Sequence, residues 1–238
     1  MGDLPVWVGE RLGYPEERVV RGAVAELAAE EFDPLSVFLV ENPCWSEEIV
    51  THGLPDEVFE RDETPMTKSE VRSVSLSKLA LTRGAVVYDV GSGSGSVSVE
   101  AALLAAEGKV YAIEMKEKAA ELTRRNGDRF HLHNLEVIQG RAPEALEPLP
   151  APTHAFIGGS AGSMREIVRC LLDKNPRVRV VANAVTLESM AELSALAGEF
   201  DHSEIAEISV AKPRVLGRYR LMTAQNPVYV FAMWNGER

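Results

Sequence analysis

The chain has 238 residues, of which 45% are hydrophobic and 26% are charged, and its formal net charge at pH 7 is −11. This composition is typical of a globular protein with one full domain and an appendage. A protein with this much negative charge repels the phosphate backbones of nucleic acids, and we therefore expect no nucleic-acid partner. No apolar stretch approaches the roughly 20 residues of a membrane span. We expect a cytoplasmic protein without a leader, whose two cysteines, Cys44 and Cys170, form no disulfide framework.

The first 43 residues predict a small strand–helix–strand fragment. Val6–Val8 and Leu35–Val40 have the apolar, β-branched composition of strands, and Val19–Phe32 has the periodicity of an amphipathic helix. A β-α-β fragment this small cannot bury its faces alone, so we expect it to need the rest of a sheet. Residues 44–64 are interpreted as a linker and entry segment.

The main domain, expected over residues 65–238, opens with a helix. Thr67 is followed three residues later by Glu70, which is the pattern of a capping box, so Thr67 is predicted to cap a helix that runs to Arg83. The start of this helix could lie over a ligand pocket, and an ordinary capped helix explains the pattern equally well.

A buried strand and a glycine-rich turn come next, in the order Val86–Val90 with Asp89, then Gly91, Gly93 and Gly95. Glycine allows a sharp turn and the close approach of a ligand, and the helix N-terminus that follows offers free N–H groups. Ser96 stands where a dinucleotide fingerprint needs its third glycine, and no Gly-Lys-Ser/Thr follows, which excludes a P-loop. A structural turn without a ligand is the alternative.

Val110–Glu114 is a second strand that ends in an acid, whose carboxylate can accept hydrogen bonds from both ribose hydroxyls. The turn and this acid together resemble class I S-adenosylmethionine (SAM) methyltransferases. The resemblance implies an α/β, Rossmann-like, mainly parallel seven-stranded sheet with a C-terminal antiparallel hairpin. It also implies SAM contacts from Thr67, Asp89, Gly91, Ser92, Gly93, Ser94, Gly95, Ser96, Glu114, Arg141, Ala142 and Gly158.

Arg141 departs from the pattern of these enzymes, which usually place an acid there, facing the adenine amino group. Arginine accepts no hydrogen bond, so we expect backbone groups near Ala142 to recognise adenine.

The rest of the chain continues to alternate between strands and helices. Strands are predicted at residues 135–139, 155–160, 178–184, 205–210 and 227–234, and helices at 116–130, 164–174 and 187–197. The last two strands are expected to form the antiparallel pair that closes the sheet. Ligands bind outside the carboxyl ends of strands in such sheets, where Gly158–Ser160 and Asn183 lie.

A closer resemblance is carried by five motifs in order: Gly53–Asp56, Pro65–Arg72, Gly158–Ser160, Asn183–Glu188 and Asn226–Val228. Over about residues 53–234 they resemble the CbiT family, the decarboxylating precorrin-6Y (precorrin-6B) methyltransferases of cobalamin synthesis. Residues 6–43 resemble the C-terminal tail of the CbiE family, which precedes CbiT in CobL-type fusions. We therefore interpret the chain as the C-terminal half of a CobL-type protein whose CbiE-like domain is missing.

This resemblance implies methylation at ring carbon 15 of a precorrin, decarboxylation of the acetate on carbon 12, and a homotetramer. It assigns catalytic roles to Ser160, Asn183, Thr186 and Glu188, and substrate contacts to Lys68 and Gly159. No metal is expected. Four cations within nine residues are predicted to form a rim for the substrate's carboxylates: Lys212, Arg214, Arg218 and Arg220. A solvated hairpin is the plain alternative for these four.

Two other functions stay open. A tRNA adenine methyltransferase can have a similar glycine turn, but it needs a basic face and stacking aromatics, whereas this chain is acidic and 6% aromatic. A non-catalytic SAM-binding scaffold for the CbiE part is the second, and Ser160 and Asn183 at strand ends argue against it.

Overall fold

The computed structural model describes residues 4–42 and 52–237. The chain forms two compact units, Met1–Val50 and Thr51–Arg238. The first part of the predicted linker, with Cys44, lies outside the described residues. None of the helices in the described ranges is long and apolar enough to cross a membrane.

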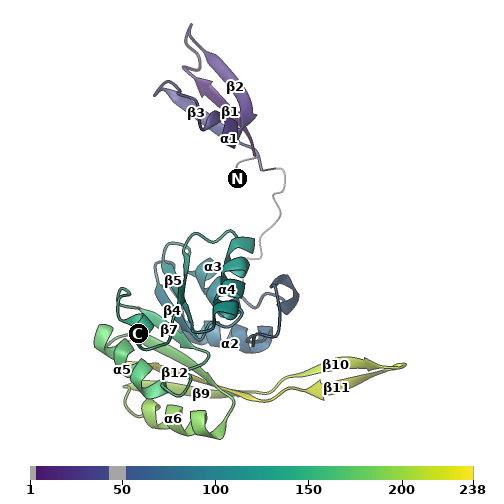
Figure 1. The fold of residues 1–238 in the computed structure, drawn as a ribbon, viewed down its shortest axis with the longest axis vertical. Helices are drawn as coiled ribbons and strands as arrows, with labels where there is room; N and C mark the ends of the chain where they lie inside the picture. Colours follow the sequence, from purple (N-terminus) through teal and green to yellow (C-terminus); the bar gives the residue numbers. More distant parts are fainter. Residues whose placement is uncertain (1–3, 43–51, 238) are drawn as a thin grey trace. The chain divides into compact units, whose positions relative to one another are not determined.

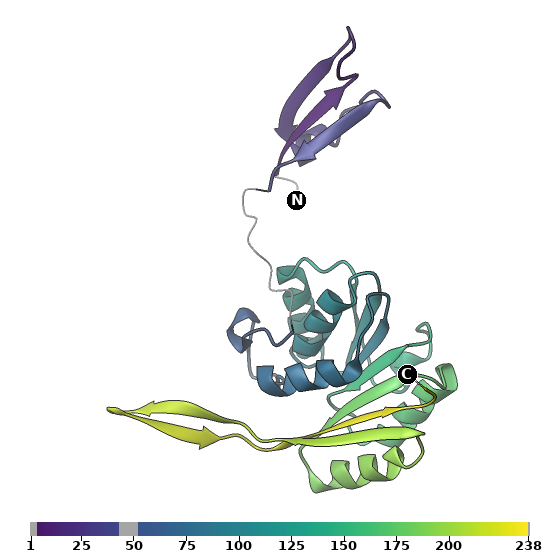
Figure 2. The same cartoon turned by 180° about the vertical axis from the view of Figure 1, so that it is seen from behind.

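The N-terminal unit is a three-stranded antiparallel sheet with one short helix (Figures 1 and 2). Its elements are β1 Pro5–Glu10, β2 Arg18–Ala23, α1 Val24–Leu27 and β3 Ser36–Val40, in the sheet order β2-β1-β3. Val6, Val8 and Leu27 form its small core. The predicted β-α-β arrangement is therefore wrong, because residues 18–23 are a strand and the helix has only four residues.

The error at residues 18–23 has a local cause. Val19 and Val20 are β-branched and Gly22 weakens a helix, so this stretch prefers an extended backbone when a partner strand is present. β1 is that partner, with Val8 opposite Val20. The third strand, β3, lies at the sheet edge with all its residues exposed. The need of this unit for a further sheet stays a prediction.

The C-terminal unit contains a seven-stranded sheet in the order β6-β5-β4-β7-β8-β12-β9. Its strands are β4 Val86–Val90, β5 Lys109–Glu114, β6 Leu135–Gln139, β7 His154–Ile157, β8 Arg179–Ala184, β9 His202–Ile208 and β12 Val228–Trp234. Strands β4 to β8 pair in parallel, and β12 runs antiparallel to β8 and β9. The predicted mainly parallel sheet with its antiparallel C-terminal pair is confirmed.

Helices cover both faces of this sheet (Figure 1). They are α2 Ser69–Leu79, α3 Ser96–Leu104, α4 Glu117–Arg129, α5 Met164–Lys174 and α6 Leu187–Ala197, with single 3-10 turns at Asp56–Val58 and Glu144–Leu146. Apolar residues of α2 and α3 pack on one side of β4, around Val87. Those of α5 and α6 pack on the other side, around Tyr88 and Val90. Alternate residues of β4 thus enter two cores, as strand geometry requires.

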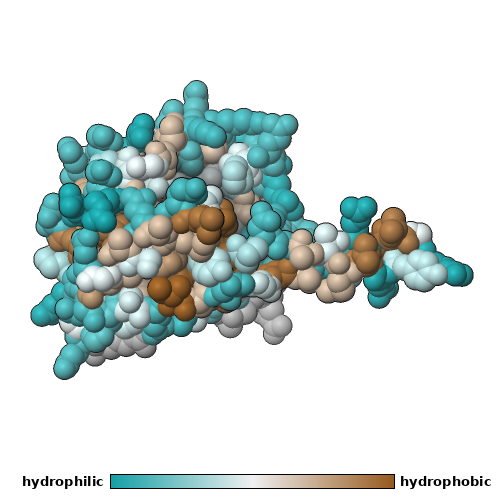
Figure 3. Space-filling view, turned by 90° about the horizontal axis from the view of Figure 1, so that it is seen from below, coloured by the Kyte–Doolittle hydropathy of each residue, from teal (hydrophilic) through white to brown (hydrophobic). Residues whose placement is uncertain are grey.

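A two-stranded hairpin, β10 Ala211–Leu216 and β11 Tyr219–Ala224, extends from the edge of the sheet (Figures 1 and 2). Every residue of β11 is exposed, including Leu221 and Met222, and apolar side chains are visible along the hairpin in Figure 3. The segment with the four predicted substrate cations is thus an exposed hairpin, and their role as a substrate rim stays a prediction.

Candidate functional site

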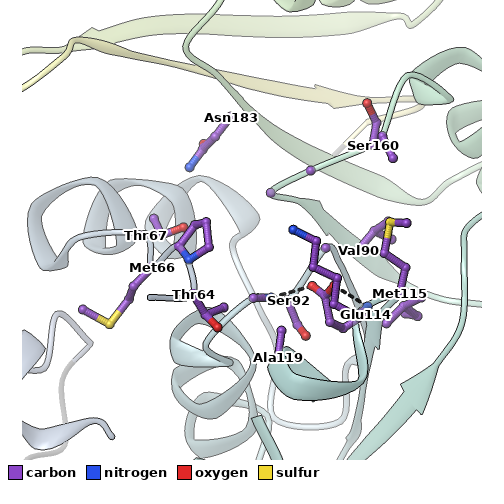
Figure 4. Close-up of a pocket in the computed structure, with 18 of the residues that line it drawn as sticks. Thr64, Met66, Thr67, Val90, Ser92, Glu114, Met115, Ala119, Ser160 and Asn183 are labelled. Carbon is purple, nitrogen blue, oxygen red and sulfur yellow. Dashed lines mark hydrogen bonds between the residues drawn. The ribbon is translucent and has the colours of Figure 1, made fainter. Parts of the chain in front are cut away.

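A cavity of about 430 Å³ lies at the carboxyl ends of the parallel strands (Figure 4). A volume of this size suits a small-molecule ligand. The predicted site residues that line it are Thr67, Lys68, Gly91, Ser92, Gly93, Glu114, Arg141, Ala142, Gly158, Gly159, Ser160 and Asn183. The predicted site residues that do not line it are Asp89, Ser94, Gly95, Ser96, Thr186, Glu188, Lys212, Arg214, Arg218 and Arg220.

The turn after β4 requires its glycines. Gly91, Gly93 and Gly95 have φ values of 73°, 58° and 78°, which side chains disfavour. A Cβ on Gly91 would lie 2.6 Å from the carbonyl oxygen of Gly159, and one on Gly93 would lie 2.7 Å from that of Pro65. Only glycine therefore allows the loop after β7 and the segment before α2 to pack directly on the turn.

Glu114, at the end of β5, faces the cavity and is held by backbone amides (Figure 4). Its Oε2 accepts a hydrogen bond from the Gly93 amide at 3.1 Å, and its Oε1 accepts one from the Lys116 amide at 2.9 Å. Each carboxylate oxygen has a further lone pair for a ligand hydroxyl. The acid predicted for ribose recognition is thus fixed in place on the cavity wall.

Asp89 lies behind the turn and is only 1% exposed. The Ser98 hydroxyl donates to its Oδ2, and Oδ1 has no hydrogen-bond partner. Burial raises the pKa of Asp89 to about 7, the Ser98 hydrogen bond opposes this shift, and the nearby Glu114 carboxylate adds to it. Asp89 therefore supports the turn from inside the protein, away from the cavity lining.

A fully buried arginine, Arg72 on α2, holds the segment that covers one side of the cavity. Its Nε donates to Glu100 Oε1 at 2.5 Å, its Nη1 to the Thr67 carbonyl at 2.6 Å, and its Nη2 to the Leu54 carbonyl at 2.5 Å. Nη1 also lies 3.3 Å from Asp56 Oδ1. Because each of the three nitrogens has an acceptor and two of the acceptors are carboxylates, the buried charge is compensated.

The predicted capping box at Thr67 is wrong in its detail. α2 begins at Ser69, its N-cap residue is Lys68, and no side chain of the cap residue bonds to the helix. Asp56 Oδ1 instead accepts the Ser69 amide at 3.0 Å. An acid from the entry segment thus satisfies a free amide of the first turn, and the carbonyl of Thr67 is left for Arg72.

A second buried side chain, Asn126 on α4, joins the same segment to the glycine turn. Its Oδ1 accepts the Glu60 amide at 2.7 Å, and its Nδ2 donates to the carbonyls of Glu60 at 3.2 Å and Ser94 at 2.8 Å. Thr123, one turn earlier, donates to the carbonyl of Gly93 at 3.0 Å. The glycine turn and the entry segment are therefore fixed to one another.

Arg72, Glu100 and Asn126 were not among the predicted site residues. One signal was available: Arg72 shares a helix face with Leu76 and Leu79, and Glu100 sits in the apolar helix α3. Two opposite charges on two buried faces indicate a buried ion pair. Most of their other partners are backbone amides and carbonyls, which have no sequence signal.

The predicted catalytic residues separate into two pairs. Ser160 and Asn183 line the cavity, from the ends of β7 and β8 (Figure 4). Thr186 is the N-cap of α6, where its Oγ1 accepts the Ser189 amide at 3.2 Å, and Glu188 is exposed in the first helical turn. The structure thus brings two of the four into the cavity.

The predicted substrate cations also separate. Lys68 lines the cavity, and its Nζ lies 3.9 Å from Asp56. Lys212 Nζ lies 2.8 Å from Glu70 Oε1, which lowers the pKa of Glu70. The three arginines of the set are exposed and belong to the β10–β11 hairpin and its turn: Arg214, Arg218 and Arg220.

Arg141, predicted near adenine, lines the cavity and donates from Nη2 to the Ala161 carbonyl at 3.3 Å. Within residues 4–42 and 52–237, no group of three or more His, Cys, Asp or Glu side chains is placed to hold a metal ion.

Comparison with known proteins identifies the family. A model of the precorrin methyltransferase domain matches residues 57–235. A protein from Pyrobaculum calidifontis named probable cobalt-precorrin-6B C(15)-methyltransferase (decarboxylating) is 46% identical over 188 residues, which cover 77% of this chain and 96% of that protein. The crystal structure of a precorrin-6y C5,15-methyltransferase from Geobacter metallireducens is 35% identical, with a TM-score of 0.73 over 79% of this chain and 100% of that one.

A third relative is the precorrin 8W decarboxylase of Methanobacterium thermoautotrophicum, whose structure is 33% identical with a TM-score of 0.69 over 76% of this chain and 98% of that one. The matches include the glycine turn, Glu114 and the cavity walls, because the family model covers residues 57–235. The resemblance predicted for about residues 53–234 is confirmed: this chain belongs to the precorrin methyltransferase family.

Proposed function

We propose that this protein transfers a methyl group from SAM to carbon 15 of a precorrin and decarboxylates its carbon 12 acetate, in cobalamin biosynthesis. The observation that carries the proposal is a single cavity that joins the glycine turn and Glu114 to Ser160 and Asn183. At one end of the cavity, the glycine turn and the Glu114 carboxylate offer hydrogen-bonding groups that fit a nucleoside. The other end is lined by the carboxyl ends of strands, where a second ligand can bind.

The residues around the glycine turn fit SAM. Gly91 and Gly93 bring backbone groups to the cavity, and Glu114 has carboxylate lone pairs for two ribose hydroxyls. Backbone groups near Ala142 are the adenine contacts that we propose. When bound, SAM supplies an electrophilic methyl group on a sulfonium, so the protein needs to hold the acceptor carbon in line with it.

The acceptor needs little chemical activation, because the meso carbons of a reduced tetrapyrrole are electron-rich and enamine-like. Orientation is then the main contribution of the protein, and it can lower a barrier by about 7–11 kcal/mol in ideal cases. Gly159 has no atom within 4 Å of the position of a Cβ, so the wall beside Ser160 is open to a flat macrocycle. Asn183, on the next strand, orients the macrocycle through its carboxamide.

Decarboxylation breaks the bond between the acetate methylene and its carboxyl carbon. The electron pair passes into an adjacent protonated ring C=N group, and a proton then replaces the lost CO₂. The protein assists by keeping the departing carboxylate poorly solvated. Apolar side chains on the cavity wall serve this purpose in our proposal: Met66, Val185 and Val228.

The test is to mix the protein with SAM and precorrin-6B and to follow the product mass. Gain of one methyl group with loss of one CO₂ supports the proposal. Two methyl groups would mean that a second carbon is also methylated. SAM binding without any product would favour the scaffold alternative, and tight, strongly salt-dependent RNA binding would favour the tRNA methyltransferase alternative.

For the N-terminal unit we propose that residues 1–43 are the C-terminal end of a CbiE-like domain. Its edge strand β3 supports this, because Phe38 and Leu39 are 72% and 67% exposed on an unpaired edge that another sheet could cover. A homotetramer is our proposal for the assembly, and sedimentation equilibrium of the full chain tests it.

A further inference from the structure

A fully buried serine on α2 contacts the one carboxamide among the predicted catalytic residues. Ser75 Oγ lies 3.1 Å from Asn183 Oδ1, and it is also 2.9 Å from the Val71 carbonyl oxygen one turn earlier. Ser75 is 0% exposed, whereas Asn183 lines the cavity. A cavity residue on β8 is thus held from behind by a residue on a different element.

A carboxamide needs such a partner to have a defined orientation. Its terminal torsion is soft, and its oxygen and nitrogen have nearly the same shape but opposite hydrogen-bonding character. The Val71 carbonyl already accepts the Ser75 backbone amide in the helical pattern, so it does not depend on the hydroxyl proton. That proton is therefore available to Asn183 Oδ1.

When Oδ1 accepts from Ser75, the Nδ2 group of Asn183 faces the cavity. Figure 4 shows this nitrogen pointing toward Thr67, another residue that lines the cavity. An NH₂ group offers two donors and no acceptor. It therefore matches a carboxylate or carbonyl oxygen and does not match a ring N–H.

We infer that Ser75 is a positioning residue that orients Asn183 as a hydrogen-bond donor to a carboxylate of the precorrin. This inference rests on the proposed function and adds to it the polarity of one substrate contact. The substrate suits that polarity because its periphery carries several carboxylates, each an acceptor only. Ser75 itself touches neither ligand, since it is fully buried and absent from the cavity lining.

The first test is a double-mutant cycle of Ser75→Ala and Asn183→Ala, measured as kcat/KM for the precorrin. We expect Ser75→Ala to lower kcat/KM about ten-fold, the factor for a hydrogen bond of ordinary strength. In the Asn183→Ala background the same change should have almost no effect. Equal losses in both backgrounds would overturn the inference, because Ser75 would then act through packing alone.

Ser73→Ala is the matched control. Ser73 makes the same bond to the carbonyl four residues earlier, from its Oγ to Ser69 at 2.7 Å, but it does not contact Asn183. It should retain wild-type kcat/KM. S-adenosylhomocysteine affinity and melting temperature should be the same in Ser75→Ala and Ser73→Ala, which shows that both variants are folded.

Asn183→Asp tests the polarity. It keeps the shape and the acceptor for Ser75 but replaces both donors with a negative charge. We expect a precorrin KM at least about ten-fold above that of Asn183→Ala, since two carboxylates would face one another. A precorrin KM lower in Asn183→Asp than in Asn183→Ala would contradict the inference that Asn183 faces the substrate as a hydrogen-bond donor. Full activity of Asn183→Ala would show that Asn183 makes no substrate contact that the reaction needs, which would overturn the inference. Absence of product from the wild-type protein would instead refute the proposed function itself.

Discussion

On the glycine-turn side of the cavity, the wall includes the main chain of Gly91 and Gly93 and one carboxylate that two backbone amides hold in place. On the side of β7 and β8, single side chains such as Ser160 and Asn183 face the space beside Gly159, where a Cβ would meet no atom. Glycines 91, 93 and 95 have no such room, because a Cβ on any of them would collide with a neighbouring segment.

The difference corresponds to what each side binds in the proposed function. Backbone packing gives the glycine-turn side a fixed shape, which suits a cofactor that is the same in every turnover. A large macrocycle needs open space and a few oriented side chains. Substitutions should therefore have large effects on the first side, mainly in cofactor affinity, and graded effects on the second, mainly in precorrin kinetics.

The largest effect is expected from Gly91→Ala. Gly91 has φ 73°, and its Cβ would lie 2.6 Å from the Gly159 carbonyl oxygen, so the backbone of one loop must shift. S-adenosylhomocysteine affinity, measured by calorimetry, should fall by about 100-fold or more. Gly84→Ala is the control, because Gly84 has open space around it and should bind as the wild type does. A Gly91→Ala protein with wild-type affinity would show that the turn does not shape the cofactor site.

A loss of stability is expected when the arginine that holds the entry segment is replaced. Arg72→Met removes the cationic partner of the buried Glu100 and leaves Asp56 with Lys68 alone, 3.9 Å away, which should cost about 3–5 kcal/mol of unfolding free energy in urea. Arg83→Met breaks the exposed pair with Glu107 and should change stability little. If the two variants were equally stable, the buried network would not be what holds this side of the cavity.

Asp89 gives a pH-dependent prediction on the glycine-turn side. Its pKa rises from 3.8 to about 7 in the folded protein, so the stability that it contributes is present below pH 4 and is lost as the pH rises through 7. Asparagine does not ionise, so Asp89→Asn removes the loss of stability that accompanies the ionisation of Asp89. The melting temperature of the variant should therefore exceed that of the wild type by a margin that grows between about pH 4 and pH 7 and then levels off. A constant margin across that range would contradict the raised pKa.

The smallest effect is expected at the hairpin, whose arginines do not line the cavity. Replacing its three exposed arginines with glutamine should raise the precorrin KM a few-fold, leave kcat unchanged and flatten the salt dependence. These are Arg214, Arg218 and Arg220. A control with the same change in net charge at Arg83, Arg169 and Arg177 should leave KM unchanged. Equal KM shifts in the two sets would support the plain solvated hairpin.

The sequence by itself determined the parts of this protein whose signals are local. The run from Val86 to Ser96 combines an apolar strand with alternate glycines, and both the strand period and the need for positive φ act within a few residues. The same holds for Glu114 and Asn183, because the end of a parallel strand can be located from its own residues. The mainly parallel seven-stranded sheet with its antiparallel C-terminal pair follows from the methyltransferase resemblance and is confirmed.

Tertiary structure decided what depends on a distant partner. Residues 18–23 became a strand because β1 was there to pair with them, and Asp56, not Thr67, satisfied the start of α2. The anchoring by Arg72 and Asn126 uses mostly backbone carbonyls and amides, which every sequence contains, so no residue pattern predicts them. Whether Thr186 or Asn183 reaches the cavity likewise depended on where β8 ends and α6 begins, and a shift of three residues separates a cavity wall from an exposed helix cap.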